Sequence, residues 1–307
     1  MLCLLAPLTA PGTLEGIKNF RPVSPSLPGI YRSAGLESAT PADVAQFLDG
    51  AKIRTIIDLR NDDEIDKARR DGTDYGLALV DAFNRRAPVG PGQLASEGSG
   101  NLRRVRVPLL CDVDAFFDGV AAQLSPAKKA EAMAYKAFNA RRYDQLLYDE
   151  VSRGRQTLLY TTMLKTSTGW GEALRLAADR SSGNVLFHCA QGKDRTGVLA
   201  ALLQHAAGDE PQAILAEYAA SEALLMQTPE DLAAEDAKKR AAAASGSKGT
   251  AAEENGGVDW SALRGSPPEA MAETLDWIRA EYGAIDYFLA SVGCDEDWRQ
   301  VLLRSYR

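Results

Sequence analysis

Residues 185–197 read Val-Leu-Phe-His-Cys-Ala-Gln-Gly-Lys-Asp-Arg-Thr-Gly, the most informative stretch of the chain. Its first three residues form an apolar run typical of a buried strand, and the apolar run 198–203 behind it is typical of a helix. A strand that turns tightly into a helix points backbone N–H groups and the positive end of the helix dipole into the turn. The stretch therefore predicts a cradle for an anion such as a phosphate.

Two side chains in this turn can act on a bound phosphate. Arg195 lies six positions after Cys189, and its planar fork can bind two phosphoryl oxygens. The helix dipole and the cations of Lys193 and Arg195 favour the thiolate, which is the nucleophilic form of cysteine. We therefore expect Cys189 to attack phosphorus and to form a cysteinyl-phosphate that water then hydrolyses.

The other residues of the turn receive supporting roles. The hydroxyl of Thr196 can donate to the sulfur when it leaves in the second step, and His188 is expected to order the loop by hydrogen bonding rather than to act as a base. The predicted phosphate-binding residues are Ala190, Gln191, Gly192, Lys193, Asp194, Arg195 and Thr196.

The loop resembles that of the atypical tyrosine phosphatases among the cysteine-dependent phosphatases, which read His-Cys-x-x-Gly-Lys-Asp-Arg-Thr-Gly. This group includes bacterial enzymes that act on phosphotyrosine and on phosphoinositides. The resemblance extends to residues 19–21, 29–34, 53–60 with Glu64, and 274–289. Pro22 departs from it, because the family usually has Asp there. The resemblance implies a phosphomonoester hydrolase, and the expected mechanism needs neither a cofactor nor a metal.

Alternating strand and helix patterns predict an α/β fold, a largely parallel sheet flanked by helices. The strand-like segments are 29–32, 53–59 and 104–110, and a helix is expected at 40–50. Leu275, Ile278, Tyr282, Ile285 and Leu289 step at helical spacing, with a hinge near Gly283.

We interpret residues 1–307 as one phosphatase domain with three distinctive parts. Residues 1–27 are rich in Pro and expected to be irregular, and a Gly/Pro/Ser stretch at 87–100 is expected to be a loop. Residues 114–180 are expected to form a helical insertion, which by the resemblance can act as a lid. Residues 233–257, rich in Ala, Gly, Ser and Lys, are expected to be a mobile insertion.

Composition limits the partners and the compartment. The chain has 35 Lys and Arg against 42 Asp and Glu, and a net charge of −7 argues against a general nucleic-acid or anionic-membrane surface. No apolar run approaches the ~18 residues of a membrane span, and the short apolar start does not resemble a signal peptide. The cysteines at 3, 111, 189 and 294 show no pairing pattern, which favours reduced thiols in the cytoplasm. The oligomeric state stays open.

Three carboxylic acids are candidates for the general acid that protonates the leaving oxygen. Asp112 ranks first, because it follows the strand-like segment that ends at Leu110. Asp114 is the second choice. Asp194 lies inside the loop, where it can orient water, help to protonate the leaving group, or simply pair with Lys193.

Lys193 is the residue expected to bias substrate choice. A cation at the rim of the cradle favours polyphosphorylated head groups, unless it only supports the thiolate of Cys189. The expected substrate is a phosphotyrosine protein or a phosphoinositide. The alternatives are an inositol phosphate or pyrophosphate, and a catalytically silent module that only binds phosphate.

Several polar residues near the loop are given structural roles. Asp58, Arg60 and Glu64 are interpreted as an ion-pair cluster at a strand end, with Arg32 as a weaker candidate for the pocket. His205 is expected to be packed or solvated. Cys111 can trap an oxidised nucleophile as a disulfide only if it lies close to Cys189.

Overall fold

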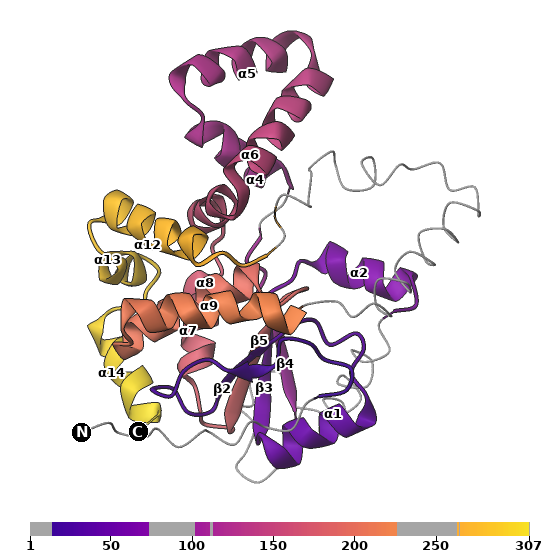
Figure 1. The fold of residues 1–307 in the computed structure, drawn as a ribbon, viewed down its shortest axis with the longest axis vertical. Helices are drawn as coiled ribbons and strands as arrows, with labels where there is room; N and C mark the ends of the chain where they lie inside the picture. The colour runs from indigo at the N-terminus through magenta and orange to yellow at the C-terminus, as the bar shows by residue number, and fades with distance from the viewer. Residues whose placement is uncertain (1–13, 74–101, 111–112, 226–262, 264, 307) are drawn as a thin grey trace.

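A five-stranded sheet in the order β1-β2-β5-β3-β4 forms the centre of the computed structural model, which describes residues 14–73, 102–110, 113–225, 263 and 265–306 (Figure 1). All neighbouring strands are parallel except β1, which pairs antiparallel with β2. The expected largely parallel α/β sheet is confirmed. The strands are β1 Arg21–Pro22, β2 Ile30–Ser33, β3 Ile53–Asp58, β4 Arg103–Arg106 and β5 Asn184–His188.

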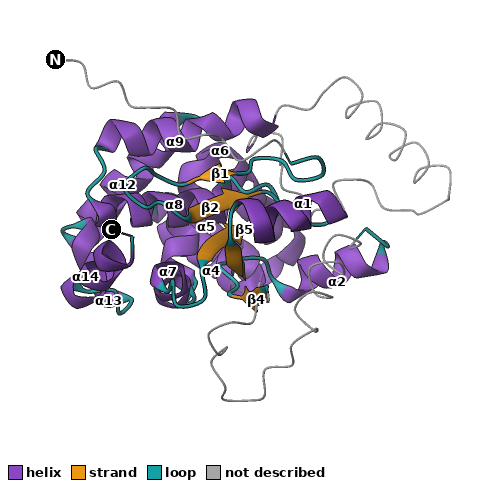
Figure 2. Cartoon of the chain, turned by 90° about the horizontal axis from the view of Figure 1, so that it is seen from below, coloured by secondary structure: helices purple, strands orange, loops and turns teal. Residues whose placement is uncertain are grey.

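Helices cover both faces of this sheet (Figure 2). They are α1 Pro41–Ala45, the π-helical turn η1 Gln46–Gly50, α2 Asp62–Arg70, α4 Val113–Gln123, α5 Pro126–Phe138, α6 Ala140–Thr166, α7 Trp170–Ala178, α8 Asp194–Ala207, α9 Pro211–Leu225, α12 Pro268–Tyr282, α13 Ile285–Ser291 and α14 Glu296–Ser305.

The central strand β5 divides the core, because successive side chains of a strand point to opposite faces. Val185 and Phe187 belong to the larger apolar cluster, which includes residues of α6, α7, α8 and α12. Leu186 points to the other face, where it packs with a smaller cluster from α1, η1 and β3. All three side chains are fully buried. An apolar run with no polar alternation is what a strand covered on both faces requires.

The carboxyl ends of three parallel strands meet where β5 turns into α8. Ser33 at the end of β2 and Asp58 at the end of β3 both lie in register with His188. The turn 189–193 therefore starts between two neighbouring strand ends, which is where open parallel sheets place their ligand sites.

Three segments differ in detail from the sequence prediction. The strand expected at 104–110 is only Arg103–Arg106, and Pro108, which has no N–H to donate to a ladder, follows soon after. The expected helix 40–50 is α-helical only to Ala45 and then widens into η1. The Pro-rich start contributes the short strand β1, so residues 1–27 are not wholly irregular.

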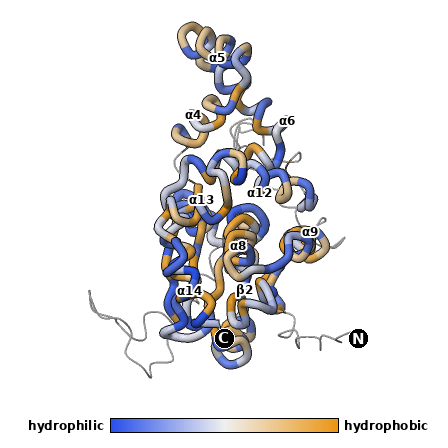
Figure 3. Tube along the Cα trace, turned by 90° about the vertical axis from the view of Figure 1, so that its left-hand side faces the viewer, coloured by the Kyte–Doolittle hydropathy of each residue, from blue (hydrophilic) through white to orange (hydrophobic). Residues whose placement is uncertain are grey.

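The stretch expected to be a helical insertion is helical, and part of it projects from the body (Figures 1 and 3). Helices α4, α5 and the first part of α6 rise beyond the carboxyl edge of the sheet. α6 is interrupted at Arg155, whose backbone has φ 50° and ψ −146°. The expected hinge near Gly283 is confirmed, since α12 ends at Tyr282 and Gly283 has φ 86°.

Some predictions fall on residues that the structure does not describe. The expected loop at 87–100 and the expected mobile insertion at 233–257 lie outside the described residues, as do Cys111 and Asp112. Among the helices that are described, none has the length and apolarity needed to cross a membrane.

Candidate active site

The backbone carbonyl groups of the turn between β5 and α8 accept hydrogen bonds from residues around the turn. Gly35 N–H donates to the Ala190 carbonyl at 2.8 Å, and His188 Nδ1 donates to the Cys189 carbonyl at 3.2 Å. The side-chain amide of Asn19 donates to the carbonyls of Gln191 at 3.1 Å and Gly192 at 2.9 Å. Since a peptide's N–H points opposite to its C=O, fixing these carbonyls outward turns the loop N–H groups inward.

The inward N–H groups meet no acceptor in the part of the chain that the structure describes. Among the described residues, no acceptor contacts the backbone N–H groups of 190–196, and the first that is satisfied is Gly197, bonded to the Lys193 carbonyl at 2.8 Å. The first turn of α8, which begins at Asp194, belongs to this set and has no capping side chain. Converging free N–H groups at a helix start form an anion-binding site.

Gly192 makes the tight loop possible. Its φ is +65°, and a Cβ there would lie 2.0 Å from the Ser33 carbonyl oxygen. Both the left-handed backbone and the close approach to the end of β2 therefore require glycine.

Cys189 and Arg195 lie together at the base of the loop. The residue Cys189 is 1% exposed and Arg195 is 8% exposed. Burial alone would lower the pKa of the Arg195 guanidinium, but the hydrogen bonds of Glu64 and the charges of the Cys189 thiolate and Glu64 hold that pKa above its ordinary value. The carboxylate and the sulfur beside Arg195 therefore favour its charged form.

Glu64 binds Arg195 in a bidentate pair. Nη1 donates to Oε2 at 2.5 Å and Nη2 donates to Oε1 at 2.7 Å, while Nη1 also lies 3.4 Å from the Leu59 carbonyl. These bonds occupy the end of the guanidinium formed by Nη1 and Nη2. The side edge, formed by Nε–H and the second N–H of Nη2, meets no acceptor within the described chain, so it is left for two phosphoryl oxygens.

Glu64 was expected in an ion-pair cluster with Asp58 and Arg60, but in the structure these residues form two separate ion pairs. Arg60 pairs with Asp58 at 2.8 Å and also with Glu37, whereas Glu64 belongs to Arg195. Burial raises the pKa of Asp58 to about 6, against the opposing charges of Arg104 and Arg195, and burial lowers the pKa of Arg60 to about 10.

His188 is enclosed beneath the loop as a neutral imidazole. It is fully buried, and burial with the charge of Arg60 holds its pKa well below the ordinary value. Nδ1 carries the proton, because it faces the Cys189 carbonyl, which can only accept. Nε2 lies 3.7 Å from Asp58 and has no hydrogen-bond partner among the described residues.

A second layer of charges from β1, β2 and α9 supports the loop. Glu217 on α9 pairs with Arg21 at 2.8 Å and with Arg32 at 2.5 Å. Arg32 donates to the Gly192 carbonyl at 2.7 Å, and Arg21 donates to the Asn19 side-chain oxygen, which leaves the Asn19 amide directed at the loop. Arg32 therefore fixes the position of the Gly192 carbonyl and does not belong to the predicted phosphate-binding residues.

Asp194 is anchored by two buried tyrosines. Tyr160 of α6 donates its hydroxyl proton to Oδ1 of Asp194 at 2.7 Å, so Tyr218 of α9 must donate to Tyr160 across the 2.7 Å between their hydroxyls. Burial and the Asp194 charge raise the pKa of Tyr160 well above its ordinary value. Asp194 itself keeps partial exposure, with 24% of its side chain accessible.

Lys193 does not lie free at the rim as expected. It is 2% exposed, and Nζ donates to Oδ1 of Asp194 and to the Leu263 carbonyl, both at 2.9 Å. The ion pair that the sequence left open as an alternative for Asp194 is therefore present. A lysine with two protein acceptors has little capacity for a second phosphate.

The three general-acid candidates differ in their position relative to the loop. Asp194 lies at the start of α8 inside the loop, and Asp114 is exposed in the first turn of α4. Asp112 lies outside the described residues. The hydroxyl of Thr196 is buried beneath the loop and has no partner in the part of the chain that is described, so it can still bond a neighbouring sulfur.

Sequence reasoning missed the supporting residues. At the start of α2 the Glu64 carboxylate accepts the Asn61 backbone N–H at 2.9 Å, and this Asn-x-x-Glu spacing could have placed Glu64 at the carboxyl end of β3, beside Cys189. Asn19, Tyr160 and Glu217 are distant in sequence and carry no local signal. In the described ranges, no group of three or more His, Cys, Asp or Glu is arranged to hold a metal.

Comparison with known proteins agrees with this geometry. The model of the tyrosine phosphatase family matches residues 13–307. A tyrosine-protein phosphatase of Nostoc commune is 33% identical over 128 residues, which are 42% of this chain and 40% of that protein. The match thus spans less than half of the relative. The family model covers nearly the whole chain, and the chain therefore belongs to the tyrosine phosphatase family.

Proposed function

We propose that this protein hydrolyses phosphomonoesters through a cysteinyl-phosphate on Cys189. The thiolate attacks phosphorus, the phosphorus–oxygen ester bond breaks, and the leaving oxygen takes a proton from a carboxylic acid. Water then attacks the phosphorus and gives a proton to the carboxylate. The phosphorus–sulfur bond breaks, which releases inorganic phosphate and restores the thiolate.

The observation that carries this proposal is the unsatisfied lining of the loop. The N–H groups of 190–196 and the side edge of Arg195 all lack acceptors among the described residues, and they belong to the turn and helix start that follow Cys189. Preorganised donors of this kind stabilise the charge on phosphoryl oxygens in the transition state without rearrangement. The hydroxyl of Thr196, which has no partner among the described residues, suits hydrogen bonding of the departing sulfur. A reducing, cytoplasm-like compartment suits the free thiol.

For the general acid, both Asp112 and Asp194 remain in the proposal. Asp194 has the support of position, because it stands in the loop with its Oδ1 anchored by Tyr160 and Lys193. That anchoring leaves Oδ2 to carry the proton. Asp112 keeps its place by the resemblance alone.

We propose a phosphotyrosine protein as the preferred substrate, with phosphoinositides as the second class. The Cys189 sulfur lies deep, at 1% residue exposure, and an aryl phosphate has the reach that a deep site needs. Lys193, the cation expected to favour polyphosphorylated head groups, is bound to Asp194 and Leu263 instead. The burial of the Cys189 sulfur therefore favours phosphotyrosine more strongly than the charge of Lys193 favours phosphoinositides.

Phosphate release from p-nitrophenyl phosphate tests the chemistry, with Cys189→Ser and Cys294→Ser as a matched pair. Cys294 is a buried thiol between α13 and α14 that donates to the Gly171 carbonyl at 3.7 Å. We expect complete loss in the first variant and full activity in the second. EDTA should have no effect. Full activity in Cys189→Ser would overturn the mechanism, and wild-type binding of phosphopeptide without any product would favour the silent binding module.

A substrate panel tests the preference. Phosphotyrosine peptides, phosphoinositides in vesicles and soluble inositol phosphates are compared by kcat/KM. The proposal expects the highest kcat/KM for phosphotyrosine and little change in this order in Lys193→Ala. If polyphosphorylated inositols are preferred and Lys193→Ala removes this preference, Lys193 does bind additional phosphates and the proposed preference for phosphotyrosine fails.

A further inference from the structure

Lys193 is a cation of the loop that the proposed mechanism does not use. It is the N-cap residue of α8 and is only 2% exposed. Its ammonium donates to Oδ1 of Asp194 and to the backbone carbonyl of Leu263, both at 2.9 Å. Asp194 belongs to the loop itself, whereas Leu263 comes from outside it. The position of the Lys193 ammonium therefore depends on the segment that carries Leu263.

That segment lies just before α12 and is held against α6 and α9. We refer to Leu263, Gly265 and Ser266 as the strap. The Leu263 side chain is 6% exposed and belongs to the larger apolar cluster. The hydroxyl of Ser266 is buried and donates to the Ala219 carbonyl of α9 at 3.2 Å, and Gln156 of α6 donates to the Gly265 carbonyl at 3.5 Å. The strap is therefore fixed by contacts of its own, separate from the loop.

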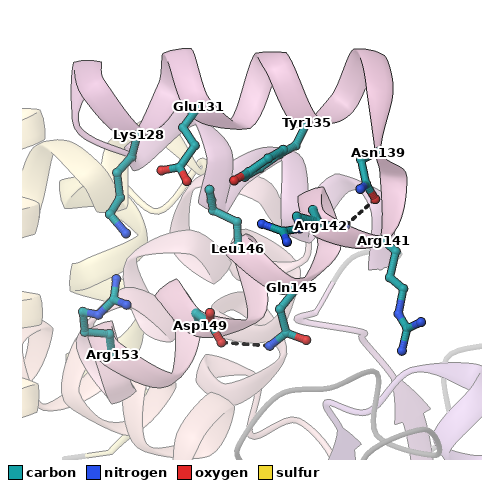
Figure 4. Close-up of a pocket in the computed structure, with 10 residues that line it drawn as sticks. All are labelled: Lys128, Glu131, Tyr135, Asn139, Arg141, Arg142, Gln145, Leu146, Asp149 and Arg153. Carbon is teal, nitrogen blue, oxygen red and sulfur yellow. Dashed lines mark hydrogen bonds between the residues drawn. The ribbon is translucent and has the colours of Figure 1, made fainter.

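Other cations of the molecule are held elsewhere. Arg32 and Arg60 each form a buried ion pair with a carboxylate. A further group of cations lines a cavity of about 520 Å³ between α5 and α6 (Figure 4): Lys128, Arg142 and Arg153. This cavity lies at the outer end of the projection, away from α8 (Figure 1). Lys193 is therefore well placed among these cations to meet a second phosphate of a substrate bound in the loop.

We propose that the strap determines the substrate preference of the loop: it holds the Lys193 ammonium away from the substrate and so favours substrates with a single phosphate. With the Leu263 carbonyl in place, the protein uses two of the three ammonium N–H groups. Displacement of the strap releases one of them for the oxygens of another phosphate. This inference rests on the proposed function, since it concerns the same loop.

The Leu263 carbonyl has this effect because a buried ammonium needs acceptors. Removing a charged group from water without hydrogen bonds is costly. Asp194 offers Lys193 the same Oδ1 that already accepts the Tyr160 hydroxyl, so the Leu263 carbonyl supplies the second acceptor. Without that carbonyl, the long side chain of Lys193 is expected to turn its ammonium toward solvent, beside the loop.

Two substitutions loosen the strap without changing the loop. Leu263→Ala removes a buried side chain, and Ser266→Ala removes the hydroxyl that binds α9. The matched controls lie on α13. Leu289→Ala removes a similarly buried leucine of the same apolar cluster, and Ser291→Ala removes a hydroxyl that donates to the Phe288 carbonyl at 2.7 Å.

Calorimetric binding of phosphotyrosine and of inositol trisphosphate tests the preference independently of turnover, because it is measured on the full chain carrying Cys189→Ser. We expect Leu263→Ala to strengthen the binding of inositol trisphosphate relative to phosphotyrosine about tenfold, as one added charge-assisted hydrogen bond would. Ser266→Ala should shift the ratio in the same direction by less. Adding Lys193→Ala to Leu263→Ala should remove the gain, and both controls should keep the parent ratio. The same ratio in the parent and in both strap variants would overturn the proposal.

Acetylation by acetic anhydride, located by peptide mass mapping, follows Lys193 itself. In the parent chain Lys193 should react far more slowly than the exposed Lys129, and in the strap variants it should approach the rate of Lys129. Ser266→Ala keeps nearly all of the buried volume, so it gives an answer even if Leu263→Ala fails to fold. A Lys193 that stays protected in Ser266→Ala and in a folded Leu263→Ala would show that the strap does not hold it, and the proposal fails.

Failure of the proposed function has a different signature. A parent chain that releases no phosphate from p-nitrophenyl phosphate would refute the hydrolase, whereas the binding ratio and the acetylation of Lys193 would still report on the strap. An active parent chain whose binding ratio is insensitive to the strap would refute only the present inference.

Discussion

Glu64 binds the Arg195 guanidinium through both carboxylate oxygens, at 2.5 and 2.7 Å, and so fixes the plane of that guanidinium. The pair joins α2, which follows β3, to α8, which follows β5. In the proposed mechanism Glu64 is a positioning residue, since both of its carboxylate oxygens bind Arg195.

Glu64→Gln should lower kcat/KM for p-nitrophenyl phosphate by about tenfold to a hundredfold, because the neutral amide no longer matches the fork of Arg195. Its Nε2 would face Nη1 or Nη2 as a second donor. Asp63→Asn removes one charge from the same turn of α2 and is the control. An equal, small effect of both substitutions would show that only the overall charge matters. Competitive inhibition by arsenate should weaken in parallel, as expected for a loss of oxyanion binding.

Asn19→Asp tests the outward carbonyls of the loop. The substitution keeps the shape but removes the N–H₂ group that donates to Gln191 and Gly192, and it places a carboxylate against two carbonyl oxygens. We expect inhibition by arsenate to weaken about tenfold, because the loop N–H groups lose their alignment. Asn139→Asp, at the exposed N-cap of α6, should have no effect on inhibition. Unchanged arsenate affinity in Asn19→Asp would mean that the other outward bonds suffice.

Gly192→Ala and Gly208→Ala separate backbone strain from a steric clash. Both glycines have positive φ, +65° and +84°, but a Cβ at Gly208 meets nothing within 4 Å, whereas at Gly192 it meets the Ser33 carbonyl at 2.0 Å. Gly208→Ala should lower the free energy of unfolding by about 1 kcal/mol and leave activity intact. Gly192→Ala should lower it further and abolish activity. Urea unfolding and p-nitrophenyl phosphate assays measure both, and similar losses in the two variants would refute the clash.

Tyr160→Phe and Tyr218→Phe test the anchoring of Asp194. Tyr160 touches Asp194 directly and Tyr218 touches only Tyr160, so we expect the larger fall in kcat in Tyr160→Phe. If Asp194 protonates the leaving group, this fall should grow with the pKa of the leaving alcohol and vanish for the best leaving groups. The dependence of kcat on leaving group, measured with substituted phenyl phosphates, decides it. A fall that is uniform across leaving groups would instead favour Asp112 as the acid.

His188→Gln tests the buried neutral imidazole. The pKa of His188 lies below its unfolded value of about 6.5, so the unfolded chain binds the extra proton, and this contribution to stability is lost as pH falls below that value. Asp58, whose pKa burial raises to about 6, takes up a proton in the native state over a similar range and contributes the opposite slope. The informative quantity is therefore the difference between variant and wild type.

From pH 6 to pH 5, the wild type should lose stability relative to His188→Gln by up to about 1.4 kcal/mol per pH unit. The control is His205→Gln, which changes the chain's other histidine, a partly exposed residue 3.2 Å from Asp286. Chemical denaturation at a series of pH values gives both differences. A pH-independent difference for His188→Gln would show that this imidazole is charged in the folded protein.

The sequence alone predicted the strand, turn and helix at 185–203 and the largely parallel sheet to which they belong. The apolar run at 185–187, the glycines of the turn and the helix behind them act over short distances, so a local pattern is enough to predict a strand, a tight loop and a helix. The early end of the strand expected at 104–110 was not visible in the sequence, because pairing depends on where the neighbouring β3 ends.

Only the tertiary structure decided which side chains surround the loop. Glu64 pairs with Arg195 rather than with the predicted cluster, because α2 places it there. Lys193 binds Asp194 and the Leu263 carbonyl instead of lying at the rim of the loop. Asn19, Tyr160 and Glu217 reach the site from three other elements. Ion pairs and buried hydrogen bonds require particular distances between segments far apart in sequence, and only packing sets those distances.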